Sequence, residues 1–306
     1  MEILNFIKVN VKFQEVDPPV TTPYVGTMLR GAFGHSLRKI FCIFNKRKSC
    51  KTCSVKEGCF YYKVFETPAP PDSPFSLNYS PHPFVISPTK PKLEKSPLLE
   101  FDFLLFGKFT NYYSYFVRTL KEMGSIGFGS KRSKSESLEI YDSDRLIFSS
   151  RKENFKEPTR RIFLLEKPTK LQEVEIELLT PLKISSKGKV VFPPDFQQVM
   201  RSVFRRISLL AYFFEEKRLN VNFKGLLEKA KEVSLVEWEG NQVKVRRYST
   251  RKKEKMSLLG FQGRLKYKGD LGIFLPWLKA GEEFHIGKHI SFGFGKFRLL
   301  SEGRST

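Results

Sequence analysis

The sequence lacks any long hydrophobic run. No stretch of about 18 apolar residues occurs in the chain, so no segment is predicted to cross a membrane as a helix. The segment Met1–Asn5 contains an acid and no basic residue, which is not typical of a secretory signal peptide. We therefore expect a soluble, cytoplasmic protein.

Acidic residues are scarce relative to basic ones. The 306 residues include 54 Lys and Arg against 32 Asp and Glu, which gives a formal charge of +22 and a pI near 9.8. A charge of this size favours a polyanionic partner, with nucleic acid first and an acidic membrane surface second. Hydrophobic residues make up 40% of the chain, which is enough for the core of one large or two medium-sized domains.

Cysteine is absent outside one short segment, residues 42–59. Its four cysteines are Cys42, Cys50, Cys53 and Cys59. Because a cytoplasmic chain has little use for disulfides, four thiols around a Cys-x2-Cys pair favour a tetrahedral metal site. Structural zinc is the first candidate and an iron–sulfur cluster the second. The absence of a metal is also open, since the spacings are not those of a standard zinc finger. Four cysteine ligands leave no open position for catalysis.

Hydrophobic periodicity divides the first half into a few elements. We expect strands at residues 2–15, 98–106 and 137–141, with helices at about 21–44 and 110–123. Thr21, Thr22 and Pro23 are typical of a helix start. Residues 67–97 contain nine of the 18 prolines, which predicts a long irregular loop. A polar segment at 149–157 is the expected linker between two domains.

The second half repeats this kind of order. We expect strands at residues 171–179, 233–248, 260–268 and 296–300, with helices at about 193–217 and 271–278. The densest basic run begins in the last residues of the strand at 233–248 and continues beyond it. It includes Arg246, Arg247, Arg251, Lys252 and Lys253. Such a run is either a solvated loop or a segment that contacts RNA or DNA.

Two motifs recur at matching places in the two halves. Met28–Phe33 aligns with Val199–Phe204, and Gly127–Lys131 aligns with Gly293–Lys296. The repeated order predicts a strand–helix–strand–strand–helix–strand unit present twice. The expected fold is therefore α+β, with two tandem ferredoxin-like (RRM-like) domains at residues 1–150 and 151–306 and a Cys-rich insertion in the first. The sheet face without helices would suit RNA if it carried basic and aromatic residues.

A glycine-rich loop lies near the end of the chain, at Gly287–Phe297. Glycine lets a backbone approach a ligand closely with its N–H groups facing an anion, and lysine favours phosphate. We predict contact with an RNA backbone here, and the alternative is an ordinary turn. The residues of interest are Lys288, His289, Gly293, Gly295 and Lys296.

Three segments together resemble a known family. They are Pro23–Gly34 (PYVGTMLRGAFG), Phe60–Glu66 (FYYKVFE) just after the cysteines, and Gly287–Lys296 (GKHISFGFGK). Over nearly its whole length the chain is similar to CRISPR-associated endoribonucleases of the RAMP superfamily, which cut repeat RNA into guide RNAs. The resemblance implies two ferredoxin-like folds, RNA held on a basic surface, and cleavage without a metal cofactor. The simplest family members lack a four-cysteine cluster.

The chemistry implied by this resemblance is attack of an RNA 2′-OH on the neighbouring phosphorus. It leaves a 2′,3′-cyclic phosphate and a 5′-OH, and it needs proton transfer and nearby cations. Histidine suits the proton transfer. The resemblance points to His35 on the first helix as general acid or base, with Tyr24 orienting the substrate. Arg38 and Lys39 would stabilise developing charge. The alternatives are packing at the helix start for Tyr24 and a solvated helix face for the two cations.

The chain has only three other histidines. His289 is the second candidate for proton transfer, because it lies within the glycine-rich loop. His82 belongs to the proline-rich segment, which is too irregular to preorganise chemistry by itself. His285 precedes the glycine-rich loop and is expected to be a strand or turn histidine whose hydrogen bonds are satisfied.

Two further functions fit the same features. One is a non-catalytic RAMP subunit that binds guide RNA inside a CRISPR effector complex. The other is a general nucleic-acid-binding protein. The partners expected from the first two interpretations are CRISPR repeat RNA or guide RNA, together with other CRISPR effector subunits.

Overall fold

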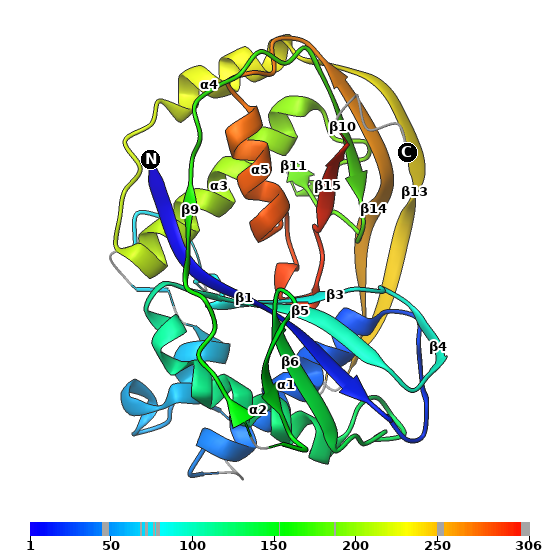
Figure 1. Cartoon of the computed structure of the whole chain (residues 1–306). Coiled ribbons are helices and arrows are strands. Elements are labelled where there is room, and N and C mark those ends of the chain that lie inside the picture. The colour runs from blue at the N-terminus through cyan, green and yellow to red at the C-terminus, as the bar shows by residue number, and fades with distance from the viewer. Residues whose placement is uncertain are drawn as a thin grey trace. The chain divides into compact units, whose positions relative to one another are not determined.

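The chain forms two compact units in the computed structural model (Figure 1). The N-terminal unit consists of Asn5–Arg161 and Phe213–Glu215, and the C-terminal unit of Met1–Leu4, Ile162–Tyr212 and Glu216–Thr306. The structure describes residues 1–300 except 45–48, 68, 71–72, 76, 78–79, 153, 187 and 250–253. Among these residues, no helix has both the length and the apolar character needed to cross a membrane.

The N-terminal unit is a ferredoxin-like fold. Its four central strands lie in the order β3-β5-β1-β6, with antiparallel neighbours, and α1 and α2 follow the first and third of these strands along the chain. The elements are β1 (Glu2–Gln14), α1 (Val25–Phe41), β3 (Phe84–Pro88), β5 (Leu99–Phe106), α2 (Tyr113–Ile126) and β6 (Ser137–Asp142). Apolar side chains of all six build one buried core.

The C-terminal unit repeats the same topology. Its sheet has the order β13-β14-β10-β15. In both units, the strands that come second, third, first and fourth along the chain lie side by side in that order. The elements are β10 (Glu173–Leu178), α3 (Phe196–Glu215), β13 (Ser234–Ser249), β14 (Glu254–Lys268), α5 (Leu275–Phe284) and β15 (Phe297–Leu300). The prediction of two tandem ferredoxin-like folds is confirmed.

Each unit adds smaller elements to this frame. The N-terminal sheet continues through β7 and β8, so this unit extends past residue 150 and includes the segment expected to be a linker. The C-terminal unit adds a short hairpin and a short helix after α3. These elements are β7 (Arg145–Ser149), β8 (Asn154–Phe155), β9 (Arg161–Leu164), which pairs with β1, the hairpin β11 (Ser185–Ser186) and β12 (Lys189–Val190), and α4 (Phe223–Lys229).

The proline-rich segment is more regular than predicted. It contains β3 and also β4 (Leu93–Ser96), which pairs with β2 (Val20–Thr22). The prolines misled the interpretation because they are excluded from central strands but tolerated at an edge. β3 is the edge strand of its sheet, paired only with β5 among the described strands.

Several helix ends differ from the predicted ones. Thr21 and Thr22 belong to β2 instead of capping a helix. The helix α1 begins at Val25 without a side-chain cap and ends at Phe41 instead of residue 44. At α3, by contrast, Asp195 and Gln198 form a reciprocal capping box, in agreement with the expected start. The helix α5 continues past Gly281 to Phe284.

Candidate catalytic and RNA-binding sites

The first site lies on α1 of the N-terminal unit, around His35. The His35 side chain is exposed, whereas its neighbours Phe33, Gly34 and Ser36 are buried. One helical turn before it, Gly31 leaves open space, since no atom lies within 4 Å of a Cβ built there. An exposed imidazole beside open surface can reach a ligand from solvent.

Lys39 lies one turn after His35 on the same helix. Its Nζ is 2.6 Å from Oε1 of Glu122 on α2, and its side chain keeps 61% of its exposure. An exposed pair of this kind contributes only about 0–1 kcal/mol. The ammonium group can therefore exchange Glu122 for a phosphate at little cost.

The other two residues predicted for this site lie elsewhere. Tyr24 is the residue before α1 and is buried, at 4% exposure. It lies eleven positions before His35, a rise of about 16 Å along a helix, and its ring is buried, whereas His35 is exposed. Arg38 is half-buried. Burial raises the pKa of the Cys50 thiol, and the charge of Arg38 partly opposes this rise, so Arg38 lies near the cysteine segment.

His82 occupies a defined position that the sequence did not indicate. Its ring packs beside the rings of Phe65 and Phe84, with centroids at 5.8 and 5.3 Å, and those two rings are 6.4 Å from each other. Its Nε2 lies 3.2 Å from Arg30 Nη2, and its Nδ1 lies 2.7 Å from Thr67 Oγ1. Arginine can only donate, so Nε2 accepts, and the proton of a neutral ring is on Nδ1. His82 therefore holds Arg30, whose guanidinium covers the Phe65 ring at 4.5 Å.

The glycine-rich loop of the C-terminal unit uses most of its backbone N–H groups internally. Those of Gly287, Lys288, Phe292, Gly293 and Gly295 all donate to acceptors of the same unit. A Cβ on Gly295 would lie 1.8 Å from the Ile286 carbonyl oxygen. The glycines thus shape the loop, and the expected cradle of free N–H groups is not formed by these five residues.

The side chains of this loop carry the second site instead, centred on His289. Its Nε2 is buried and has no hydrogen-bond partner among the described residues. Burial is the largest cause that lowers the pKa of His289 to about 4, and three nearby cations add to the effect. They are Lys183, Arg247 and Lys288. We call these four residues the His289 cluster.

Backbone and ring contacts hold the cluster together. The Lys288 N–H donates to the Lys183 carbonyl oxygen at 2.9 Å. The Arg247 guanidinium covers the Phe292 ring at 4.7 Å, and that ring lies 6.2 Å from the His289 ring. Burial and Lys288 lower the pKa of Lys183 as well. Converging positive charges that repel one another favour a bound anion.

The remaining residues predicted to bind RNA are distributed differently. Arg246 and Arg247 are adjacent on β13 and therefore point to opposite faces, with Arg246 exposed. Lys296 is half-buried, and its N–H donates to Thr180. Arg251, Lys252 and Lys253 lie outside the described residues. His285 is buried and donates from Nδ1 to the Phe294 carbonyl, which confirms it as a turn histidine with a satisfied hydrogen bond.

The C-terminal sheet does not present the basic face that RRM-like binding would need. Glutamates of β10 alternate toward solvent and pair with cations of the neighbouring strands. The pairs are Glu173–Lys266, Glu175–Arg264, Glu177–Arg264 and Glu177–Arg298. Fixed acids at the centre of this lattice disfavour a phosphate backbone.

The four cysteines remain thiols and are half-buried. Cys50 and Cys59 pack against the core of the N-terminal unit. Among the described residues, no group of three or more His, Cys, Asp or Glu side chains is arranged to hold a metal ion. The structural zinc site stays a prediction.

Two family models cover most of the chain. Residues 4–160 match the N-terminal domain family AF_1859_N, and residues 176–297 match the CRISPR-associated endoribonuclease Cas6. No curated protein matches the chain. Lys183, Arg247, Lys288 and His289 fall within the second match. His35 and Lys39 fall within the first.

Solved structures share the fold at low sequence identity. A Cas6 product complex has a TM-score of 0.58 at 16% identity and covers 97% of this chain and 100% of that chain. The Cas6 of Thermus thermophilus has a TM-score of 0.57 at 14% identity, covering 97% and 99%. A Cas6-RT-Cas1–Cas2 complex has a TM-score of 0.56 at 12% identity, and the match covers 99% of this chain and 30% of that one.

Proposed function

Because the chain belongs to the AF_1859_N family through residues 4–160 and to the CRISPR-associated Cas6 endoribonucleases through residues 176–297, we propose that it cuts CRISPR repeat RNA into guide RNAs without a catalytic metal ion. The assignment of the catalytic site rests on the exposed position of His35 on α1. His35 has open surface over Gly31 on one side and Lys39 on the other.

The reaction transfers a phosphoryl group within the RNA. The 2′ oxygen forms a bond to phosphorus while the bond from phosphorus to the 5′ oxygen breaks. One proton leaves the 2′-OH, and one proton is delivered to the 5′ oxygen. We assign His35 to one of these two transfers, since histidine exchanges protons near neutral pH. The products are a 2′,3′-cyclic phosphate and a 5′-OH.

Lys39 stabilises the charge that develops on the phosphate. In the free protein it pairs with Glu122 at 2.6 Å. When RNA binds, the phosphate replaces the carboxylate, because a cation aimed at developing charge is worth more than an exposed ion pair.

The His289 cluster binds the RNA backbone. Its three cations and the unpartnered His289 nitrogen suit one phosphate group, which would relieve the repulsion among Lys183, Arg247 and Lys288. We assign this cluster to binding because its three cations suit a phosphate, and because a lowered pKa of about 4 makes His289 a weak base that is rarely charged at pH 7. We also expect other CRISPR proteins as partners, since one structural relative is a Cas6-RT-Cas1–Cas2 complex.

The test is incubation of the protein with labelled repeat RNA in EDTA. We expect one cut whose upstream fragment ends in a cyclic phosphate. An RNA with a 2′-deoxy nucleotide at the cut should bind but stay intact. The variant His35→Ala should bind this uncleavable RNA normally and lose about 100-fold or more in cleavage rate. If the wild-type protein binds RNA without cutting it, the alternative of a non-catalytic guide-RNA-binding subunit replaces the proposal.

A further inference from the structure

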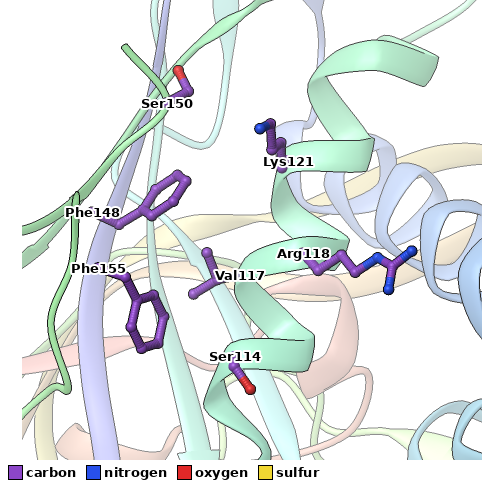
Figure 2. Close-up of a pocket in the computed structure, with 7 residues that line it drawn as sticks. All are labelled: Ser114, Val117, Arg118, Lys121, Phe148, Ser150 and Phe155. Carbon is purple, nitrogen blue, oxygen red and sulfur yellow. The ribbon is translucent and has the colours of Figure 1, made fainter. Parts of the chain in front are cut away.

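A shallow pocket lies in the N-terminal unit, between α2 and the strands β7 and β8 (Figure 2). Its volume is about 290 Å³. Ligand pockets usually span about 300–1,000 Å³, so this one suits a single small ring system. The lining residues are Ser114, Val117, Arg118, Lys121, Phe148, Ser150 and Phe155.

Two phenylalanines form one wall of the pocket. Phe148 and Phe155 are direct cross-strand partners in the β7–β8 pairing, so their side chains stand on the same face of the sheet. Phe155 is 43% exposed. Behind it the buried Tyr113 ring packs at 5.8 Å and fixes its orientation. An exposed aromatic ring that is held in place by a buried one is a ready stacking surface.

The charged side chains of the pocket are both basic. Figure 2 shows the Lys121 ammonium directed to the side of α2 on which Phe148 and Ser150 lie. Arg118 contributes its aliphatic stem, and its guanidinium points away from the two rings (Figure 2). Among the described residues, no acidic side chain lines the pocket. An aromatic wall beside a single cation matches the base and phosphate of one nucleotide.

We propose that this pocket binds one unpaired nucleotide of the RNA, outside the nucleotides at the cut. The base stacks on Phe155 and Phe148, and the adjacent phosphate contacts Lys121. Stacking accepts any base, so the pocket adds affinity for a single-stranded flank without reading its sequence. The inference rests on the proposed function only in that the ligand is RNA.

A fluorescent ring at the pocket tests the contact directly. In Phe155→Trp, the indole would replace the exposed ring, and stacking with a base quenches indole emission. We expect quenching by an uncleavable repeat RNA that carries single-stranded flanks. We expect less quenching by the same RNA trimmed to its repeat. Equal quenching by both, none by either, or quenching by a mononucleotide but not by RNA would overturn the proposal.

Affinity measurements provide the second test, with an exposed aromatic residue of α2 as the control. Tyr115 on α2 is 44% exposed and does not line the pocket. Phe155→Ala should weaken binding of the flanked RNA by about 5-fold to 100-fold, and Tyr115→Ala by less than about twofold. Lys121→Gln should make the slope of log K against log salt concentration less steep, reducing its magnitude by about 0.7.

Cleavage separates this inference from the proposed function. If both are right, Phe155→Ala cuts the trimmed repeat RNA at the wild-type rate and loses only affinity for the flank. If cleavage is absent in every variant while the flank effect remains, the proposed function fails and the pocket stands. If Phe155→Ala and Tyr115→Ala bind the flanked RNA equally, the pocket assignment is wrong whatever the cleavage result.

Discussion

Removing the Lys183 charge should weaken RNA binding and change the titration of His289 at the same time. Lys183 is half-buried beside Lys288, and it is the first of the three cations that lower the pKa of His289. In Lys183→Ala, therefore, the pKa of His289 should rise in the free protein, because one source of repulsion against the imidazolium is gone.

The size of the binding effect follows from the contact that is lost. A hydrogen bond to a charged group contributes about 1.5–3 kcal/mol, and partial exposure of Lys183 places it near the lower end. About 1.5 kcal/mol is a tenfold loss of affinity. Each lost phosphate contact to single-stranded RNA also makes the slope of log K against log salt concentration less steep, reducing its magnitude by about 0.7.

The assay is binding of an uncleavable repeat RNA between 50 and 300 mM salt, with NMR titration of the four histidines. His289→Gln identifies the His289 signal. Lys189→Ala is the matched control, because Lys189 is an exposed lysine in the neighbouring hairpin. If Lys183→Ala and Lys189→Ala give the same salt slope, and the pKa of His289 does not move, the phosphate role of the cluster is refuted.

Three further predictions follow from the site geometry. Glu122→Gln frees Lys39 from its 2.6 Å ion pair, so cleavage at subsaturating RNA should rise about twofold to fivefold, and a decrease would mean that Glu122 positions Lys39 instead. His289 has its pKa lowered to about 4, so between pH 6.5 and 4 the unfolded chain binds the extra proton and stability falls as the pH falls. The wild-type free energy of unfolding, measured in urea, should fall between pH 7 and pH 5. In His289→Gln this fall should be smaller by about 1–2 kcal/mol, after allowance for solvent screening. An equal fall in both proteins would contradict the burial of this ring. Elemental analysis of reduced, anaerobically purified protein should find about one zinc per chain if the four cysteines bind a metal, and the absence of both zinc and iron would rule the site out.

Sequence patterns predicted the architecture because the deciding signals are local and repeated. The apolar residues of β1 alternate, and those of α3 recur at helical spacing. The edge strand β3 escaped prediction because it ends in Pro88 and lies among other prolines, and a proline is tolerated there only through the position of the strand in the sheet, which no local pattern encodes.

The sites were harder to predict because they depend on contacts between distant segments. His35 was predicted because the resemblance points to a histidine on the first helix, and the structure places it on the exposed side of α1. Lys183 was missed because it is 105 positions before Lys288, and only the folded loop brings the two together. The glycine-rich loop was identified correctly as a feature, but hydrogen bonds within the unit decide that its side chains, and not its N–H groups, are offered to a ligand.

The most direct test of the central claim is the chemistry of the cut ends. Repeat RNA incubated with the protein in EDTA should yield an upstream fragment whose mass corresponds to a 2′,3′-cyclic phosphate and a downstream fragment with a 5′-OH. His35→Ala should abolish both products while still binding the RNA. A 5′-phosphate product, cleavage that requires a divalent metal, or unchanged cleavage by His35→Ala would contradict the account.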